Sequence, residues 1–149
     1  MCNFGKTKLN SYKMRHKGDS NTYISQRNDD LYEKYKDVIR HSDIIMSKEI
    51  FKRLVLMPAK RFYVSEERAG VIIRKMIKDE ELGKMKKETK KMYQDIFNIV
   101  KKMLCNDKEN TLSKIISKAL YNEAPSFYLT ENSARVIISR IKNKKYQIR

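Results

Sequence analysis

Two stretches of this sequence are near copies of each other. They read AKRFYVSEERAGVIIRKMIKD at residues 59–79 and APSFYLTENSARVIISRIKN at residues 124–143. In both, Phe-Tyr and an aliphatic residue precede Ser or Thr, and apolar residues then recur at helical spacing. A phrase that recurs at a fixed distance indicates a repeated structural unit, because each copy must bury the same face. The chain is therefore predicted to contain one unit twice.

The residues before each phrase also match. Residues 48–59 align with 113–124 at the same offset of 65. Residues 31–40 align with 92–101 at an offset of 61, so a four-residue insertion is expected after them. Each unit would then hold three helices in about fifty residues.

The predicted fold class is therefore all-α, as a tandem duplication of a three-helix, helix-turn-helix-like unit. Unit 1 is placed at residues 29–82, and a lysine-rich connector with unit 2 at residues 83–149. Two arrangements are open, in which the units fold separately or pack as one domain. Residues 1–28 mix Gly, Ser, Asn and Lys without an apolar period, so they are expected to form a flexible basic arm.

Polar caps and apolar positions define the helices. Ser47 is expected to cap the second helix of unit 1, and Ser65 and Thr130 to cap the third helix of each unit. Phe62 and Phe127, in the turn before each third helix, are expected to anchor the core. The apolar faces of the third helices are expected to bury Ala69, Ile72, Ile73, Met76, Ala134, Ile137, Ile138 and Ile141.

Charge is the strongest functional signal. Lysine and arginine number 34 against 18 acidic residues, which gives a net charge of +16. Such an excess attracts nucleic acid or an acidic protein partner. Two clusters are predicted to contact the nucleic-acid backbone, and they are Lys84, Lys86, Lys87, Lys90 and Lys91, and Arg140, Lys142, Lys144, Lys145 and Arg149.

The third helix of unit 2 could also read bases, as the second helix of a helix-turn-helix does in the major groove. Its outward residues Asn132, Ser133, Arg135 and Ser139 are of types that hydrogen-bond to base edges. The turn before it has about eight residues, however, whereas a helix-turn-helix has three or four. In unit 1, Glu66 and Glu67 head the corresponding helix and would repel phosphates.

Other classes of protein find no support in the sequence. Cys2 and Cys105 are isolated and far from both histidines, so no metal site or disulfide is predicted. No oriented nucleophile, carboxylate pair or glycine-rich phosphate loop is present, so the protein is predicted to be neither an enzyme nor a cofactor carrier. No apolar run is long enough for a signal peptide or a membrane span, so a cytoplasmic protein without a membrane partner is expected.

The repeated phrases RFYVSEERAGVIIRKM and PSFYLTENSARVIISRI resemble a group of short proteins from bacteroidete gut bacteria and their phages, over about residues 30–143. The resemblance implies a bacterial or phage origin, in the cell or the infected host, and no catalytic activity. The preferred function is a nucleic-acid-binding accessory or regulatory protein, with DNA favoured over RNA. The alternative is a helical interaction protein, such as a phage structural or host-takeover factor, whose charge serves an acidic partner.

Overall fold

The computed structural model describes residues 22–41 and 46–147, apart from the side chains of Ser47 and of residues 145–147. All the regular elements in this part of the chain are helices, so the all-α prediction is confirmed. The first helix covers residues 22–40. The others are α2 (Ser47–Leu56), α3 (Glu66–Ile77), α4 (Lys87–Asn106), α5 (Leu112–Leu120) and α6 (Glu131–Gln147).

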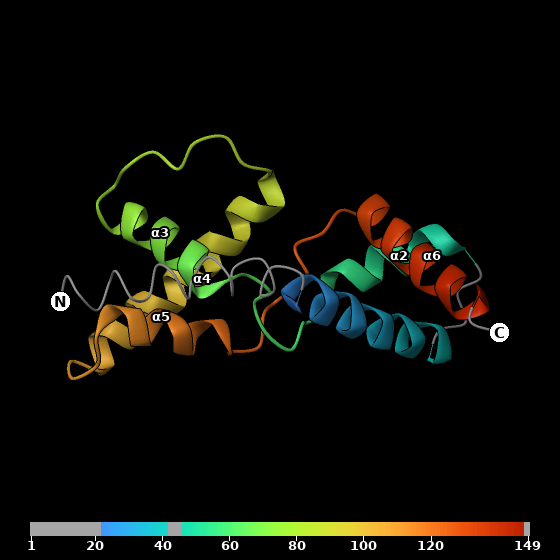
Figure 1. Cartoon of the computed structure of the whole chain (residues 1–149), viewed down its shortest axis with the longest axis horizontal. Helices are drawn as coiled ribbons and strands as arrows, with labels where there is room; N and C mark the ends of the chain where they lie inside the picture. Colours follow the sequence, from blue (N-terminus) through green and yellow to red (C-terminus); the bar gives the residue numbers. More distant parts are fainter. Residues whose placement is uncertain (1–21, 42–45, 148–149) are drawn as a thin grey trace.

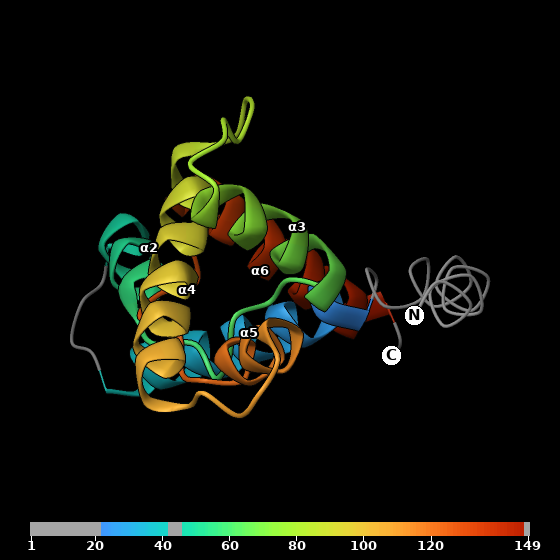
Figure 2. The same ribbon diagram turned by 90° about the vertical axis from the view of Figure 1, so that its left-hand side faces the viewer.

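The helices form two three-helix bundles that lie side by side (Figure 1). One bundle holds the first helix, α2 and α6, and the other holds α3, α4 and α5, which Figure 2 shows in front of the remaining helices. The third helix of each predicted unit thus packs with the first two helices of the other unit. The bundle of α3, α4 and α5 is one continuous segment of chain, inserted between α2 and α6.

Two extended connectors join the bundles and cross between them. Ala59 and Ala124 form an isolated antiparallel bridge, in which each N–H donates to the other residue's C=O at 2.9 Å. The connector over residues 57–65 has nine residues, and an extended chain of that length can span about 30 Å. That reach lets α3 leave α2 and pack on the other bundle.

The second and third helices of each predicted unit therefore do not make the contact that defines a helix-turn-helix. Among the named helices, α2 does not pack on α3 and α5 does not pack on α6. In a helix-turn-helix, a turn of three or four residues brings the two helices directly together. The connectors of this chain are too long and too extended to do so.

The spacing of 65 residues reaches into the first helix. The hydroxyl of Tyr63 donates to Asp30 Oδ2 at 2.7 Å, and the hydroxyl of Tyr128 donates to Asp95 Oδ2 at 2.6 Å. Both residues of the second pair lie 65 positions after those of the first. These contacts match the first helix to α4 at an offset of 65, and not at the predicted offset of 61 with its four-residue insertion. The prediction paired Tyr32 with Tyr93, whereas the structure pairs the positions of Asp30 and Asp95.

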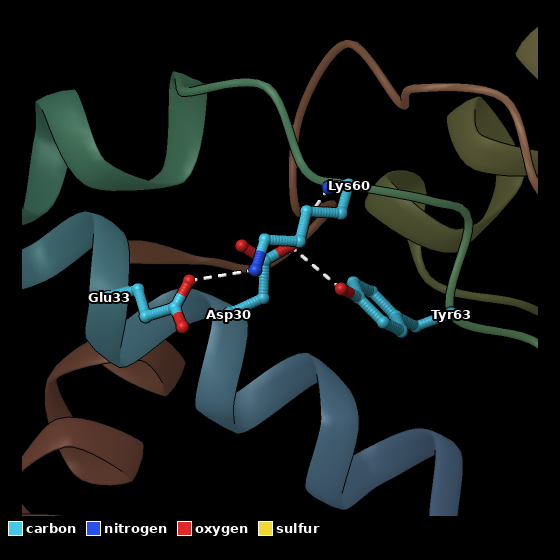
Figure 3. Close-up of polar contacts among 4 residues, drawn as sticks. All are labelled: Asp30, Glu33, Lys60 and Tyr63. Carbon is cyan, nitrogen blue, oxygen red and sulfur yellow. Dashed lines mark hydrogen bonds and ion pairs between the residues drawn. The ribbon is translucent and has the colours of Figure 1, made fainter.

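Asp30 ties the first connector to the first helix (Figure 3). Its side chain is buried, and its Oδ2 accepts hydrogen bonds from the backbone N–H of Lys60, at 2.9 Å, and from the hydroxyl of Tyr63. The ammonium of Lys60 also lies 2.8 Å from Glu33 Oε2, in an exposed ion pair. The two hydrogen bonds to Asp30 Oδ2 hold the connector against the first helix, whereas Asp30 Oδ1 is buried without a hydrogen-bond partner among the described residues.

Replacing Tyr63 and Tyr128 with phenylalanine is expected to cost about 1–3 kcal/mol per site, because each change removes one hydrogen bond to an aspartate oxygen. Burial, and next the bonded aspartate, raise the pKa of both tyrosines. Their contribution to stability is thus present below the unfolded-state pKa of about 10 and is lost as the pH rises through the folded-state pKa. Urea denaturation of the wild type and of the double variant over a range of alkaline pH checks this. As the pH rises above about 10, the double variant should lose less stability than the wild type. Equal alkaline losses in the two proteins would contradict it.

The predicted core anchors are confirmed. Phe62 is 0% exposed and Phe127 is 5% exposed, and the Phe62 ring stacks on that of Tyr128 with centroids 6.1 Å apart. Of the predicted core positions in α3 and α6, Met76, Ile137 and Ile141 are half-buried. The fully buried ones are Ala69, Ile72, Ile73, Ala134 and Ile138. One cluster of buried apolar residues extends through both bundles.

Two of the three predicted caps are confirmed. The side chain of Ser65 accepts a hydrogen bond from the N–H of Arg68 at 3.1 Å, and that of Thr130 accepts one from the N–H of Ser133 at 3.1 Å. Ser47 is not a cap, because the extended backbone of the preceding residue, Met46, places the N-cap there and Ser47 inside the first turn of α2.

The predicted flexible arm extends too far along the chain. Residues 22–28 are the first turns of the first helix, and residues 1–21 lie outside the described part. Tyr23, Arg27, Leu31 and Tyr35 recur every four residues, so they share one face of this helix. A tyrosine and an arginine on that face concealed the period, because neither counts as a purely apolar residue.

Candidate nucleic-acid interface

The first lysine cluster lies at the start of α4. Lys84 and Lys86 precede the helix and Lys87, Lys90 and Lys91 lie in its first turns, and all five side chains are exposed. Lys90 and Lys91 lie three and four residues after Lys87, so each of them neighbours Lys87 on the helix surface. The ion pairs of the described residues are Arg40 with Asp37 and Lys60 with Glu33, so none of the five lysines is in one.

The position of this cluster is unfavourable for the helix itself. The N-terminus of a helix carries partial positive charge, which favours acidic residues and disfavours lysine. Glu88 is the only acidic residue in the first turn of α4, and its N-cap, Lys86, makes no side-chain capping bond. The five lysines therefore do not stabilise the fold locally, and an anion bound beside them would.

The second cluster is only partly available. Arg140 and Lys144 are exposed on α6. Lys142 instead donates to the Tyr35 hydroxyl at 2.6 Å, and its ammonium lies 4.6 Å from the centroid of that ring, so it joins α6 to the first helix. The side chain of Lys145 and all of Arg149 lie outside the described residues.

The candidate base-contacting residues lie on α6, and three of them are exposed. Asn132, Arg135 and Ser139 point away from the buried face, and the guanidinium of Arg135 lies 5.6 Å from the ring centroid of Phe51. Ser133 is half-buried, and its hydroxyl lies 2.9 Å from that of Thr130, so it belongs to the helix cap.

Two arginines that the sequence analysis passed over join this surface from other elements. Arg27 of the first helix and Arg61 of the first connector line one pocket with Lys86. Arg27 fell within the predicted arm, and Arg61 stands alone before Phe62. Only the helical spacing from Tyr23 to Tyr35 could have indicated that Arg27 lies in an ordered helix.

Other kinds of site find no support among the described residues. No three His, Cys, Asp or Glu side chains of that part of the chain come together as metal ligands would. None of its helices combines the length and the apolar character that crossing a bilayer requires. Cys105 is exposed and free.

Comparison of the chain with family models, curated proteins and solved structures found no match. The resemblance drawn from the repeated phrases stays a prediction. The case for function therefore depends on the placement of charge.

Proposed function

We propose that the protein binds nucleic acid through the phosphate backbone, as an accessory or regulatory factor of a bacterium or phage. The observation that carries the proposal is the lysine cluster at the start of α4, whose members are exposed and form no ion pair. Lysines placed in this way release counterions from a polyanion without needing base-specific geometry. Duplex DNA is the first ligand to test.

We also propose that the chain is a tandem duplication of a three-helix unit. Support comes from the two tyrosine–aspartate bonds, which recur 65 residues apart. The bridge between Ala59 and Ala124 also joins two residues that are 65 positions apart. The positions equivalent to Lys87, Lys90 and Lys91 are then Thr22, Ser25 and Gln26, which are uncharged. The fold accepts neutral residues at these helical positions, so a demand of the fold does not explain the lysines.

The alternative is a helical protein-interaction factor. It is supported by large apolar side chains left on the surface, such as Met46 and Leu56 at the two ends of α2, which are 67% and 69% exposed. In that case the basic surface would attract an acidic protein partner, and duplex DNA would bind no better than any polyanion.

Changing Lys84, Lys87, Lys90 and Lys91 to glutamine is expected to weaken binding to every DNA sequence, because phosphate contacts carry no base information. Each lost contact should make the slope of log K against log salt shallower by about 0.9. Fluorescence anisotropy with duplex DNA over a salt series measures both quantities.

The matched control changes Lys102, Lys108, Lys114 and Lys118 to glutamine, because these exposed residues lie elsewhere, on α4, on α5 and in the loop between them, and carry the same total charge. It should leave the salt slope near that of the wild type. Equal losses in both variants would mean that only net charge matters. No loss in the first variant would favour the interaction factor.

A further inference from the structure

We propose that the pocket between the two bundles is a binding site for a single phosphate group. The pocket has a volume of about 270 Å³ and is lined by the first helix, both connectors, the start of α4 and the start of α6. Three of its lining residues are cationic, Arg27, Arg61 and Lys86, and one is acidic, Glu88. It carries an excess of positive charge in a partly enclosed space.

Arg27 brings a charge that no acidic residue offsets. It is half-buried, and its Nε and Nη2 both donate to the side chain of Asn28, at 3.2 and 3.0 Å, which is a neutral acceptor. Burial alone lowers the pKa of its guanidinium. A partly buried cation without a counter-charge destabilises a fold, so a bound anion would remove that cost.

Arg61 is held in place without an ion pair among the described residues, and Asp29, Asp30 and Glu33 line a neighbouring pocket with it. Its guanidinium lies 4.3 Å from the ring centroid of Tyr121 and 4.8 Å from that of Tyr23, and its Nε donates to the Phe62 carbonyl at 3.2 Å. Its Nη2 is buried and has no hydrogen-bond partner among the described residues. Aromatic faces orient a guanidinium and leave its charge available. A buried donor without a partner is uncommon, and a ligand oxygen could supply one after a small rotation of the side chain.

Under the proposed duplication, the fold accepts other residues at the positions of these arginines. The positions equivalent to Arg27 and Arg61 are Met92 and Ser126, which also line this pocket. A thioether and a small hydroxyl thus satisfy the corresponding places in the fold. The two arginines, together with Lys86, give the pocket its positive charge.

The chemistry and size favour phosphate. A guanidinium fork matches two oxygens of a phosphate, and the hydroxyls of Thr89 and Ser126 add donors on the pocket wall. A volume of about 270 Å³ lies just below the usual range of about 300–1,000 Å³ for drug-sized ligands. The pocket therefore suits one phosphate with a small substituent, which is either a free phosphomonoester or the terminal phosphate of a nucleic-acid strand. This site does not depend on the exposed lysines used for backbone binding, apart from Lys86 at its edge.

Isothermal titration with inorganic phosphate, in chloride buffer, tests the proposal on the full chain. Arg61→Gln is expected to raise the dissociation constant at least ~10-fold, since charge-assisted hydrogen bonds are lost. Lys87→Gln removes the same charge outside the pocket and should change it less than ~2-fold. Melting each variant verifies folding. If Arg61→Gln is unfolded, Lys86→Gln replaces it, because Lys86 is exposed at the pocket edge and its loss leaves the core intact.

A second titration identifies the source of the phosphate. A short single strand with a 5′-phosphate is compared with the same strand without it, and an advantage that Arg61→Gln abolishes would assign the site to strand ends. Saturable binding of inorganic phosphate without that advantage would assign it to free phosphomonoesters. The proposal fails if the wild type binds neither probe, or if Lys87→Gln weakens binding as much as Arg61→Gln. The variant with four lysines changed keeps Arg27, Arg61 and Lys86, so it should still bind phosphate even if backbone binding is disproved.

Discussion

Phe62→Ala is expected to remove about 3–5 kcal/mol from the free energy of unfolding, which is the usual loss when a buried phenylalanine is truncated. The ring is fully buried, stacks on Tyr128 and belongs to the cluster shared by both bundles. Its backbone N–H also donates to the carbonyl of Leu120 at 3.0 Å, so the ring is held where the connectors cross. Because natural domains are stable by only about 5–15 kcal/mol, this loss would be a large fraction of the total stability.

Urea denaturation measures this loss, with Phe127→Ala and Phe97→Ala for comparison. Phe127 is 5% exposed and its N–H donates to Val55 O, so it should lose nearly as much as Phe62. Phe97 is only half-buried on α4 and should lose clearly less. Similar losses at all three positions would show that the connector rings have no special part in joining the bundles.

Dividing the chain after Gly83 is expected to abolish cooperative folding of both fragments. Gly83 lies in the exposed loop between α3 and α4, with a backbone φ of 80°. Residues 1–83 keep the first helix, α2 and α3, but α3 loses its partners α4 and α5. Residues 84–149 keep α6 without α2. Each fragment would thus expose an apolar face that its own helices cannot cover.

Circular dichroism and thermal melting of each fragment, and of their equimolar mixture, check this expectation. The mixture should recover helix and a cooperative transition, because both bundles form only when the fragments combine. A fragment of residues 58–125 is the control, since its three helices are α3, α4 and α5 and pack on one another. If residues 1–83 and 84–149 each melt cooperatively alone, the predicted units 29–82 and 83–149 fold independently. The packing of α3 on α4 and α5, and of α6 on α2, would then not be required for folding.

The helices and much of the core could be predicted because local patterns determine them. Ser65 and Thr130 cap helices whose apolar residues recur at helical spacing, and Phe62 and Phe127 are buried as their matching surroundings indicate. The partner of each third helix could not be predicted in this way. Both α2 and α5 have an apolar face on which α3 could pack. Which of the two it packs on depends on how far the extended connector reaches.

The candidate site was predictable only where it is continuous in sequence. The five lysines at residues 84–91 form a run, and all of them are exposed. Lys142 looked equivalent to its neighbours, but the hydroxyl of Tyr35, 107 positions earlier, accepts its hydrogen bond. Arg27 and Arg61 are 34 positions apart, and their approach depends on the crossing of the connectors, which no local pattern describes.

The nested order of the bundles has a consequence for synthesis on the ribosome. The inner bundle is one continuous segment, so it can fold as soon as α5 has emerged. The first helix and α2 are made earlier, yet the face that buries Leu31 and Leu54 waits uncovered until α6 follows. Domains generally fold in the order in which they emerge, and exposed apolar faces are open to aggregation in that interval. In this chain the first helix and α2 are synthesised first, yet their bundle is completed last, when α6 emerges.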